Sequence, residues 1–102
     1  MYRASDRVEH AEWLSDIERA ADSLGLGTTA RSHAVDLFLS TIPDEDRSKR
    51  ATMAASVYVG ALLASEERSQ SAVAEATGVS RLTIQQRWKG LLESAGLEAP
   101  EW

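Results

Sequence analysis

The stretch at residues 51–64, ATMAASVYVGALLA, is apolar on nearly every side when it is wound as a helix. A helix of this kind should be enclosed by other helices rather than laid on a protein surface. Its small residues, including Ala54 and Gly60, leave room for close helix approach, and the run is too short to favour a membrane helix. The stretch predicts an all-α domain built around one central helix at residues 48–65.

An amphipathic helix is predicted at residues 7–24. Asp6 with Glu9 resembles a capping box at its start, and Gly25 stops it. Its apolar residues recur on one helical face, and its other face is charged. The members of the apolar face are Trp13, Ile17, Ala20, Ala21 and Leu24.

A second helix is predicted at residues 30–42, between the first helix and the central one. Thr28 or Thr29 can cap its start, and Pro43 ends it. The acidic loop at residues 44–46 follows. A metal site there is disfavoured because no ligand spacing follows the triplet, and a solvated loop is the preferred interpretation.

The segment at residues 70–89, QSAVAEATGVSRLTIQQRWK, has the pattern of two short helices joined by a tight turn. Ser69 and Ser80 are suited to cap the two helices. Gly78 can adopt the positive φ that the turn requires, and Ala74 is small enough for the helices to cross closely. This pattern predicts a helix-turn-helix, whose second helix can lie in a DNA major groove.

The second helix of that motif, at residues 81–95, has two unlike faces and ends at Gly96. One face should join the core and consists of Ile84, Trp88, Leu91, Leu92 and Ala95. The opposite face carries Leu82, Gln86, Lys89 and Glu93, with Gln85 at its edge. The expected organisation is a single helical domain at residues 1–96, with the helix-turn-helix at 70–95 and a short tail at 97–102.

The charge distribution bears on possible partners. The net charge of −5 argues against nucleic acid, because phosphate binding depends on Lys and Arg. However, residues 1–46 carry −6, residues 47–92 carry +4 and residues 93–102 carry −3, so the predicted motif lies in the basic part. The nine Arg and two Lys, with many Ala and acidic residues, are typical of salt-loving organisms, where counterion-driven binding weakens steeply.

The residue types exclude several classes of function. The chain has no Cys, which rules out disulfides and thiolate metal sites and is compatible with a cytoplasmic location. His10 and His33 have no partners in a catalytic or metal-binding pattern, and no Gly-rich phosphate loop is present. We therefore expect no enzyme activity, no cofactor, no small-molecule substrate and no membrane association.

Residues 47–92, RSKRATMAASVYVGALLASEERSQSAVAEATGVSRLTIQQRWKGLL, resemble a cyclin-like repeat of archaeal transcription factor B, the relative of eukaryotic transcription factor IIB. Family members commonly show Tyr where Trp88 stands. The resemblance extends, less specifically, over residues 10–95. Its signs are the Ala-rich helix with Tyr58, then Ser69-Gln70 before Val73-Ala74, then Gly78-Val79-Ser80, and Thr83-Ile84 with Arg87-Trp88.

The resemblance implies a five-helix cyclin fold. In the family, the helix-turn-helix of the second repeat reads a promoter element beside the TATA box, and its base-contacting positions match Leu82 and Gln85. The best-known residue at the Gln85 position is Arg, which reads guanine, whereas Gln favours adenine. The fold and docking mode therefore carry over better than the target sequence.

Two departures from the family matter. The full-length factor has a zinc ribbon that recruits RNA polymerase, and this chain has no Cys to build one. The full-length factor also has two cyclin repeats, and this chain has room for one. We expect either an isolated domain or a stand-alone relative with a regulatory role.

Two hypotheses of function remain. In the first, the protein binds promoter DNA through candidate residues Ser80, Arg81, Leu82, Gln85, Gln86 and Lys89, with TATA-binding protein or other transcription proteins as partners. In the second, it is a cyclin-like interaction module that modulates transcription initiation without specific DNA contact. Arg47, Lys49 and Arg50 either extend a phosphate track or form a plain charged helix start. One continuous surface of Arg81, Arg87, Lys89 and the cluster at residues 47–50 would favour the first hypothesis. An acidic first helix lying over residues 81–95 would favour the second hypothesis.

Overall fold

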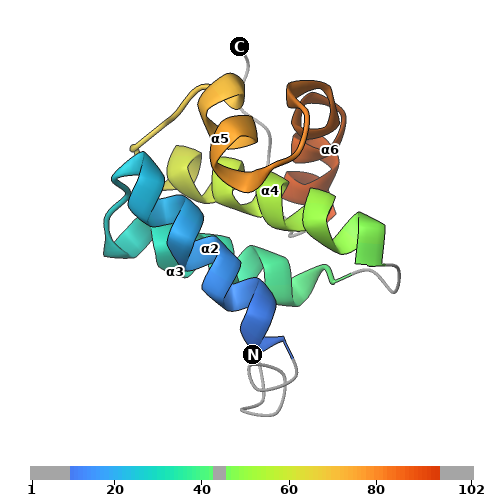
Figure 1. Cartoon of the computed structure of the whole chain (residues 1–102), viewed down its shortest axis with the longest axis horizontal. Helices are drawn as coiled ribbons and strands as arrows, with labels where there is room; N and C mark the ends of the chain where they lie inside the picture. Colours follow the sequence, from blue (N-terminus) through green and yellow to red (C-terminus); the bar gives the residue numbers. More distant parts are fainter. Residues whose placement is uncertain (1–9, 43–45, 95–102) are drawn as a thin grey trace.

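The computed structural model describes residues 10–42 and 46–94 of the chain. These residues form five helices and no strand: α2 (Ala11–Leu24), α3 (Thr28–Ser40), α4 (Asp46–Leu63), α5 (Gln70–Thr77) and α6 (Arg81–Ser94). Helix α4 runs through the middle of the molecule, with α2 and α3 on one side and α5 and α6 on the other (Figure 1). The predicted all-α architecture around one central helix is confirmed.

Helix α4 is the core element because its side chains have no solvent-facing side over three turns. Every residue from Ala51 to Ala61 is buried. The helix packs against all four of its neighbours, most extensively against α3. At Gly60, a Cβ atom would lie 2.8 Å from the carbonyl oxygen of Ala30 and 2.8 Å from the amide nitrogen of Ala34. Only glycine therefore permits the observed approach of α3 to α4.

The start of α3 differs from the prediction. The helix begins at Thr28, its N-cap is Gly27, and no side chain caps it, so the expected cap by Thr28 or Thr29 is wrong. The carboxylate of Glu66, distant in sequence, accepts a hydrogen bond from the Gly27 amide at 2.9 Å. A tertiary contact thus lies at the helix entrance where a local cap was expected.

The other helix ends largely follow the predicted pattern. Gly25 ends α2 with φ 67°, as expected. Helix α3 ends at Ser40 rather than at residue 42, and α4 occupies Asp46–Leu63 rather than residues 48–65. The predicted capping box of Asp6 and Glu9, the acidic pair at residues 44 and 45, Pro43, Gly96 and the tail lie outside the described residues.

Arg31 on α3 ties that helix to α2. Its guanidinium lies 2.8 Å from the carboxylate of Glu18 and 2.8 Å from that of Asp22, and it donates to the carbonyl of Leu26 at 3.0 Å. Hydrogen bonding to Glu18 and then to Asp22 raises the pKa of Arg31 above its usual value. Part of the acidic side of α2 is therefore neutralised within the fold.

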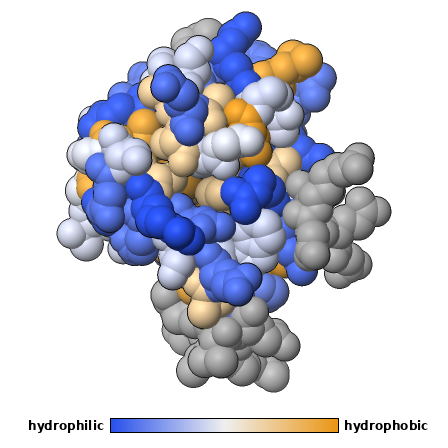
Figure 2. Space-filling view, viewed as in Figure 1, coloured by the Kyte–Doolittle hydropathy of each residue, from blue (hydrophilic) through white to orange (hydrophobic). Residues whose placement is uncertain are grey.

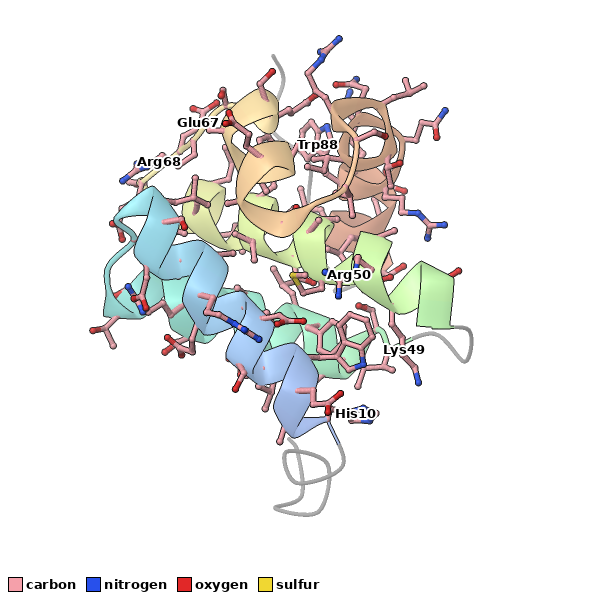
Figure 3. The ribbon with its side chains drawn as sticks, viewed as in Figure 1. His10, Lys49, Arg50, Glu67, Arg68 and Trp88 are labelled. Atoms are coloured by element: carbon pink, nitrogen blue, oxygen red, sulfur yellow. The ribbon has the colours of Figure 1, made fainter. Side chains whose placement is uncertain are left out.

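The connection between α4 and α5 is anchored on the end of α2. Arg68 donates from Nε to the carbonyl of Leu24 at 2.8 Å and from a terminal nitrogen to that of Glu66 at 2.8 Å. Figure 3 shows Arg68 and the neighbouring Glu67 at this corner of the molecule. These bonds fix where α5 begins, and through α5 they fix the placement of α6.

Candidate nucleic-acid interface

The turn between α5 and α6 has the predicted local chemistry. The amide of Ala72 donates to the hydroxyl of Ser69 at 3.0 Å, which caps α5. Gly78 has φ 77° and closes the helix through a bond from its amide to the carbonyl of Ala74 at 2.9 Å. The hydroxyl of Ser80 accepts from the amide of Thr83 at 3.1 Å, as expected for the N-cap of α6.

The inner face of α6 fixes how the helix is rotated. Its buried residues are Ile84, Trp88, Leu91 and Leu92, as predicted; Ala95 lies outside the described residues. The ring of Trp88 meets Tyr58 of α4 edge to face, with centroids 5.6 Å apart. In Figure 3, Trp88 points inward from α6. Because these anchors spread along the helix, the opposite face must point outward.

That outward face carries the candidate DNA-binding residues. All six are exposed, namely Ser80, Arg81, Leu82, Gln85, Gln86 and Lys89. Leu82 is 61% exposed, and it is one of two large apolar side chains that are exposed among the described residues. The ammonium of Lys89 lies 5.5 Å from the ring centroid of Trp88. The face combines amide, cationic and apolar groups, the types that contact base edges, phosphates and thymine methyl groups.

The acidic helix α2 leaves this face open. It packs against α3, α4 and α5, and it lies across α4 from α6 (Figure 1). Figure 2 shows mainly hydrophilic residues over α2 and a paler, partly apolar area over α5. The arrangement that would have favoured a masked helix, with α2 laid over α6, does not occur.

At the start of α4, the side chains of Lys49 and Arg50 point in different directions (Figure 3). Arg50 points toward α2, where its guanidinium lies 5.2 Å from the ring centroid of Trp13, whereas Lys49 points away from it (Figure 3). The side chain of Arg47 lies outside the described part. Arg50 and Arg87 of α6 line the same cleft, so Arg50 reaches the surroundings of α6. The sequence placed Arg87 only among the basic residues that could form one surface with Arg81 and Lys89, and it did not include Arg87 among the candidate DNA-binding residues.

The two histidines were expected to be ordinary surface or boundary residues. His10 meets the ring of Phe38 edge to face at 6.4 Å, and His33 is half-buried. Within residues 10–42 and 46–94, no three acidic or histidine side chains are grouped as metal ligands. No helix in the same part of the chain is long and apolar enough to cross a membrane.

Comparison with known proteins places these features in a family. The model described as "Transcription factor TFIIB repeat" matches residues 8–94. Transcription initiation factor IIB of Pyrococcus abyssi is 31% identical over 87 residues, which cover 82% of this chain and 29% of the relative. The protein of the same name from Archaeoglobus fulgidus is 35% identical over 85 residues, which cover 80% of this chain and 26% of the relative.

These comparisons confirm the family resemblance that the sequence indicates. The chain spans less than a third of the length of these archaeal relatives. The matched repeat has a cyclin-like all-α fold, so the expected fold class is confirmed. The salt-loving origin expected from composition and the roles of individual residues in α6 stay predictions.

Proposed function

Because the chain belongs to the family of the transcription factor TFIIB repeat, we propose that it is a DNA-binding regulator of transcription. Helix α6 enters the major groove with its outward face. Gln85 and Gln86 meet base edges, Leu82 contacts a thymine methyl group, and Arg81 and Lys89 contact phosphates. Ser80 holds the first turn of α6 in shape at the docking end.

The observation that carries the proposal is the uncovered outer face of α6. Leu82 is exposed on this face among amide and cationic side chains, a combination that suits a thymine methyl group, base edges and phosphates. An α-helix with its side chains is about 10–12 Å across, which matches the width of the major groove. The inner anchors hold this face rigidly outward, so docking needs no rearrangement of the domain.

The proposed partners are promoter DNA and transcription proteins, with TATA-binding protein as the first candidate. A domain of this size buries little DNA surface by itself, so a second protein on the same promoter would add affinity. The role requires a location beside the DNA, in keeping with the cytoplasmic location expected from the sequence.

One observation favours the alternative, a protein-interaction module that modulates initiation without specific DNA contact. Glu12 is exposed at the start of α2, and the chain has a net charge of −5. A basic protein surface would fit this side of the molecule. The first function depends on the outer face of α6 and the second does not, so one experiment separates them.

That experiment is selection from random duplexes at molar and at low salt, with and without TATA-binding protein. Enrichment of a motif in at least one condition is expected. The control is the variant Leu82→Ala, Gln85→Ala, Gln86→Ala, which leaves the buried face of α6 untouched and should lose the motif. If the wild-type protein enriches no motif in any condition, while it still binds a transcription protein, the interaction module is the correct function.

A further inference from the structure

A cleft of about 750 Å³ lies beside α6, between the start of α4, the first turns of α2 and the turn that joins α5 to α6. Its charged lining residues are Arg50, Arg87 and Glu12. The hydroxyl-bearing residues Ser80 and Thr83 also line it, and the indole of Trp13 forms part of its wall. The described lining thus has two cations, one anion and two hydroxyl groups, a composition that suits an anionic ligand.

Arg50 is held in this cleft by contacts that a stronger ligand could replace. Its guanidinium lies 3.6 Å from the carboxylate of Asp16 and donates to the carbonyl of Thr77 at 3.3 Å. Asp16 is shared, because its carboxylate also pairs with Arg19. The side chain of Arg50 is 47% exposed, so a ligand in the cleft can reach it.

Arg87 is differently placed. It is exposed on α6 and has no hydrogen bond or ion pair with any other residue that the structure describes. Thr83 and Arg87 lie one turn apart on the flank of α6 that faces the cleft, whereas Lys89 lies on the outer face beside Leu82. The flank beside the cleft is therefore also cationic.

We propose that this cleft receives one sugar-phosphate strand of the duplex, with Arg87 and Arg50 as phosphate ligands and Asp16 as an internal competitor for Arg50. The inference rests on the proposed docking of α6. A helix that fills the major groove has a phosphate strand along each flank, because the groove is barely wider than the helix. Arg81 and Lys89 serve one strand, and the cleft is continuous with the opposite flank.

Two acidic residues of α2 weaken phosphate binding in different ways. Glu12 lines the cleft and repels phosphate, and Asp16 holds Arg50 back until phosphate displaces it. Both reduce the number of counterions released when DNA binds. The acidic start of α2 at the cleft therefore moderates affinity for DNA of any sequence, which leaves more of the discrimination to base contacts.

The test is the salt dependence of binding to a short mixed-sequence duplex, measured with the full chain. Arg87→Gln should make the slope of log affinity against log salt shallower by about 0.9, the contribution of one phosphate contact. If the variant and the wild-type protein bind equally at 1 M salt, the variant should therefore bind about eight-fold more weakly than the wild type at 0.1 M salt. Arg87→Lys keeps the charge and should keep the slope.

Asp16→Asn should have the reverse effect, a steeper slope and tighter binding at low salt, because Arg50 is released. The gain should vanish when Asp16→Asn is combined with Arg50→Gln. This double variant distinguishes an effect through Arg50 from an effect through Arg19, the other partner of Asp16. Asp22→Asn is the matched control, since it removes an equal charge from α2 away from the cleft. It should leave the slope near the wild-type value.

The outcomes distinguish the cleft from the proposed function. If Lys89→Gln makes the slope shallower but Arg87→Gln and Asp16→Asn leave it unchanged, α6 binds DNA and the cleft does not. If Asp22→Asn makes the slope as steep as Asp16→Asn does, the effect comes from the loss of any negative charge on α2, and the proposed competition by Asp16 is wrong. Failure of the wild-type chain to bind any duplex, alone or with TATA-binding protein, overturns both proposals.

Discussion

Helices α4 and α6 lie side by side, yet they differ in how much of each helix is exposed to solvent. Every residue from Ala51 to Ala61 in α4 is buried, whereas α6 buries only its inner face and exposes the other. Accordingly α4 uses small and apolar residues on all sides, and α6 alternates anchors with amide and charged residues. The two helices therefore differ in their tasks. Helix α4 holds the fold together, whereas α6 also presents an exposed face whose residues can be substituted without disturbing the core.

This separation implies that the two faces of α6 can be altered independently. The inner anchors contribute to stability through apolar burial, and the outer residues contribute little to it. Substitutions at matched positions can break or sharpen the comparison.

The largest effect is expected at Ile84, which is fully buried on the inner face. Ile84→Ala should lower the free energy of unfolding by about 2–5 kcal/mol, because it removes buried apolar contacts and leaves a cavity. Leu82→Ala, on the outer face of the same helix turn, should change it by less than about 0.5 kcal/mol. Urea unfolding of both variants measures the difference, and equal losses would contradict the assignment of the two faces.

A pair of glycines compares α4 with α6 directly. Gly60→Ala forces a Cβ against the backbone of α3 and should destabilise the protein by about 1–3 kcal/mol. Gly90→Ala on α6 meets nothing within 4 Å. It should stabilise the protein by up to about 1 kcal/mol through helix propensity. Thermal unfolding gives both values, and opposite signs are the decisive result.

The outer face should be visible in DNA selectivity rather than in stability. Gln85→Ala is expected to relax discrimination at one base pair by about 1–3 kcal/mol, because one amide pairing with a base edge is lost. Competition binding with single-base variants of the selected site measures this. Glu75→Gln on α5, which is also exposed, is the control. An unchanged preference in Gln85→Ala would remove Gln85 from the reading set.

The smallest effect concerns the start of α6. Ser80→Ala removes the hydroxyl that accepts from the Thr83 amide, and it should reduce stability by about 1 kcal/mol. Ser71→Ala, on an exposed position within α5, should be nearly neutral. Unfolding midpoints of the two variants provide the comparison. A neutral Ser80→Ala would show that the cap contributes nothing to holding α6 in place.

The local chemistry of the α5–α6 pair was predictable because it depends on near neighbours in the sequence. Ser69, Gly78 and Ser80 each bond within a few residues, so their types announce the turn. Helical periodicity likewise divided α6 into inner and outer faces. The start of α3 was not predictable in this way, because its amide at Gly27 binds Glu66, which lies in the connection between α4 and α5 and is 39 residues away in the sequence.

The cleft could not be predicted either, although each of its residues is visible in the sequence. Arg50 resembled a plain charged residue at a helix start. Its partners, Trp13, Asp16 and Thr77, come from two other helices. Arg87 was visible in the sequence as one of several basic residues, and the structure adds that it shares that cleft with Arg50. Pairings of this kind depend on how helices pack.

The amino-acid sequence by itself determined the helices, the buried central rod and the two faces of α6, because periodicity and local hydrogen bonding are properties of adjacent residues. Tertiary structure alone decided that acidic α2 lies away from the outer face of α6 and that Arg50 meets Asp16 beside Arg87. The reason is physical: packing of small side chains sets which helices touch, and that choice brings together charges that the chain keeps far apart.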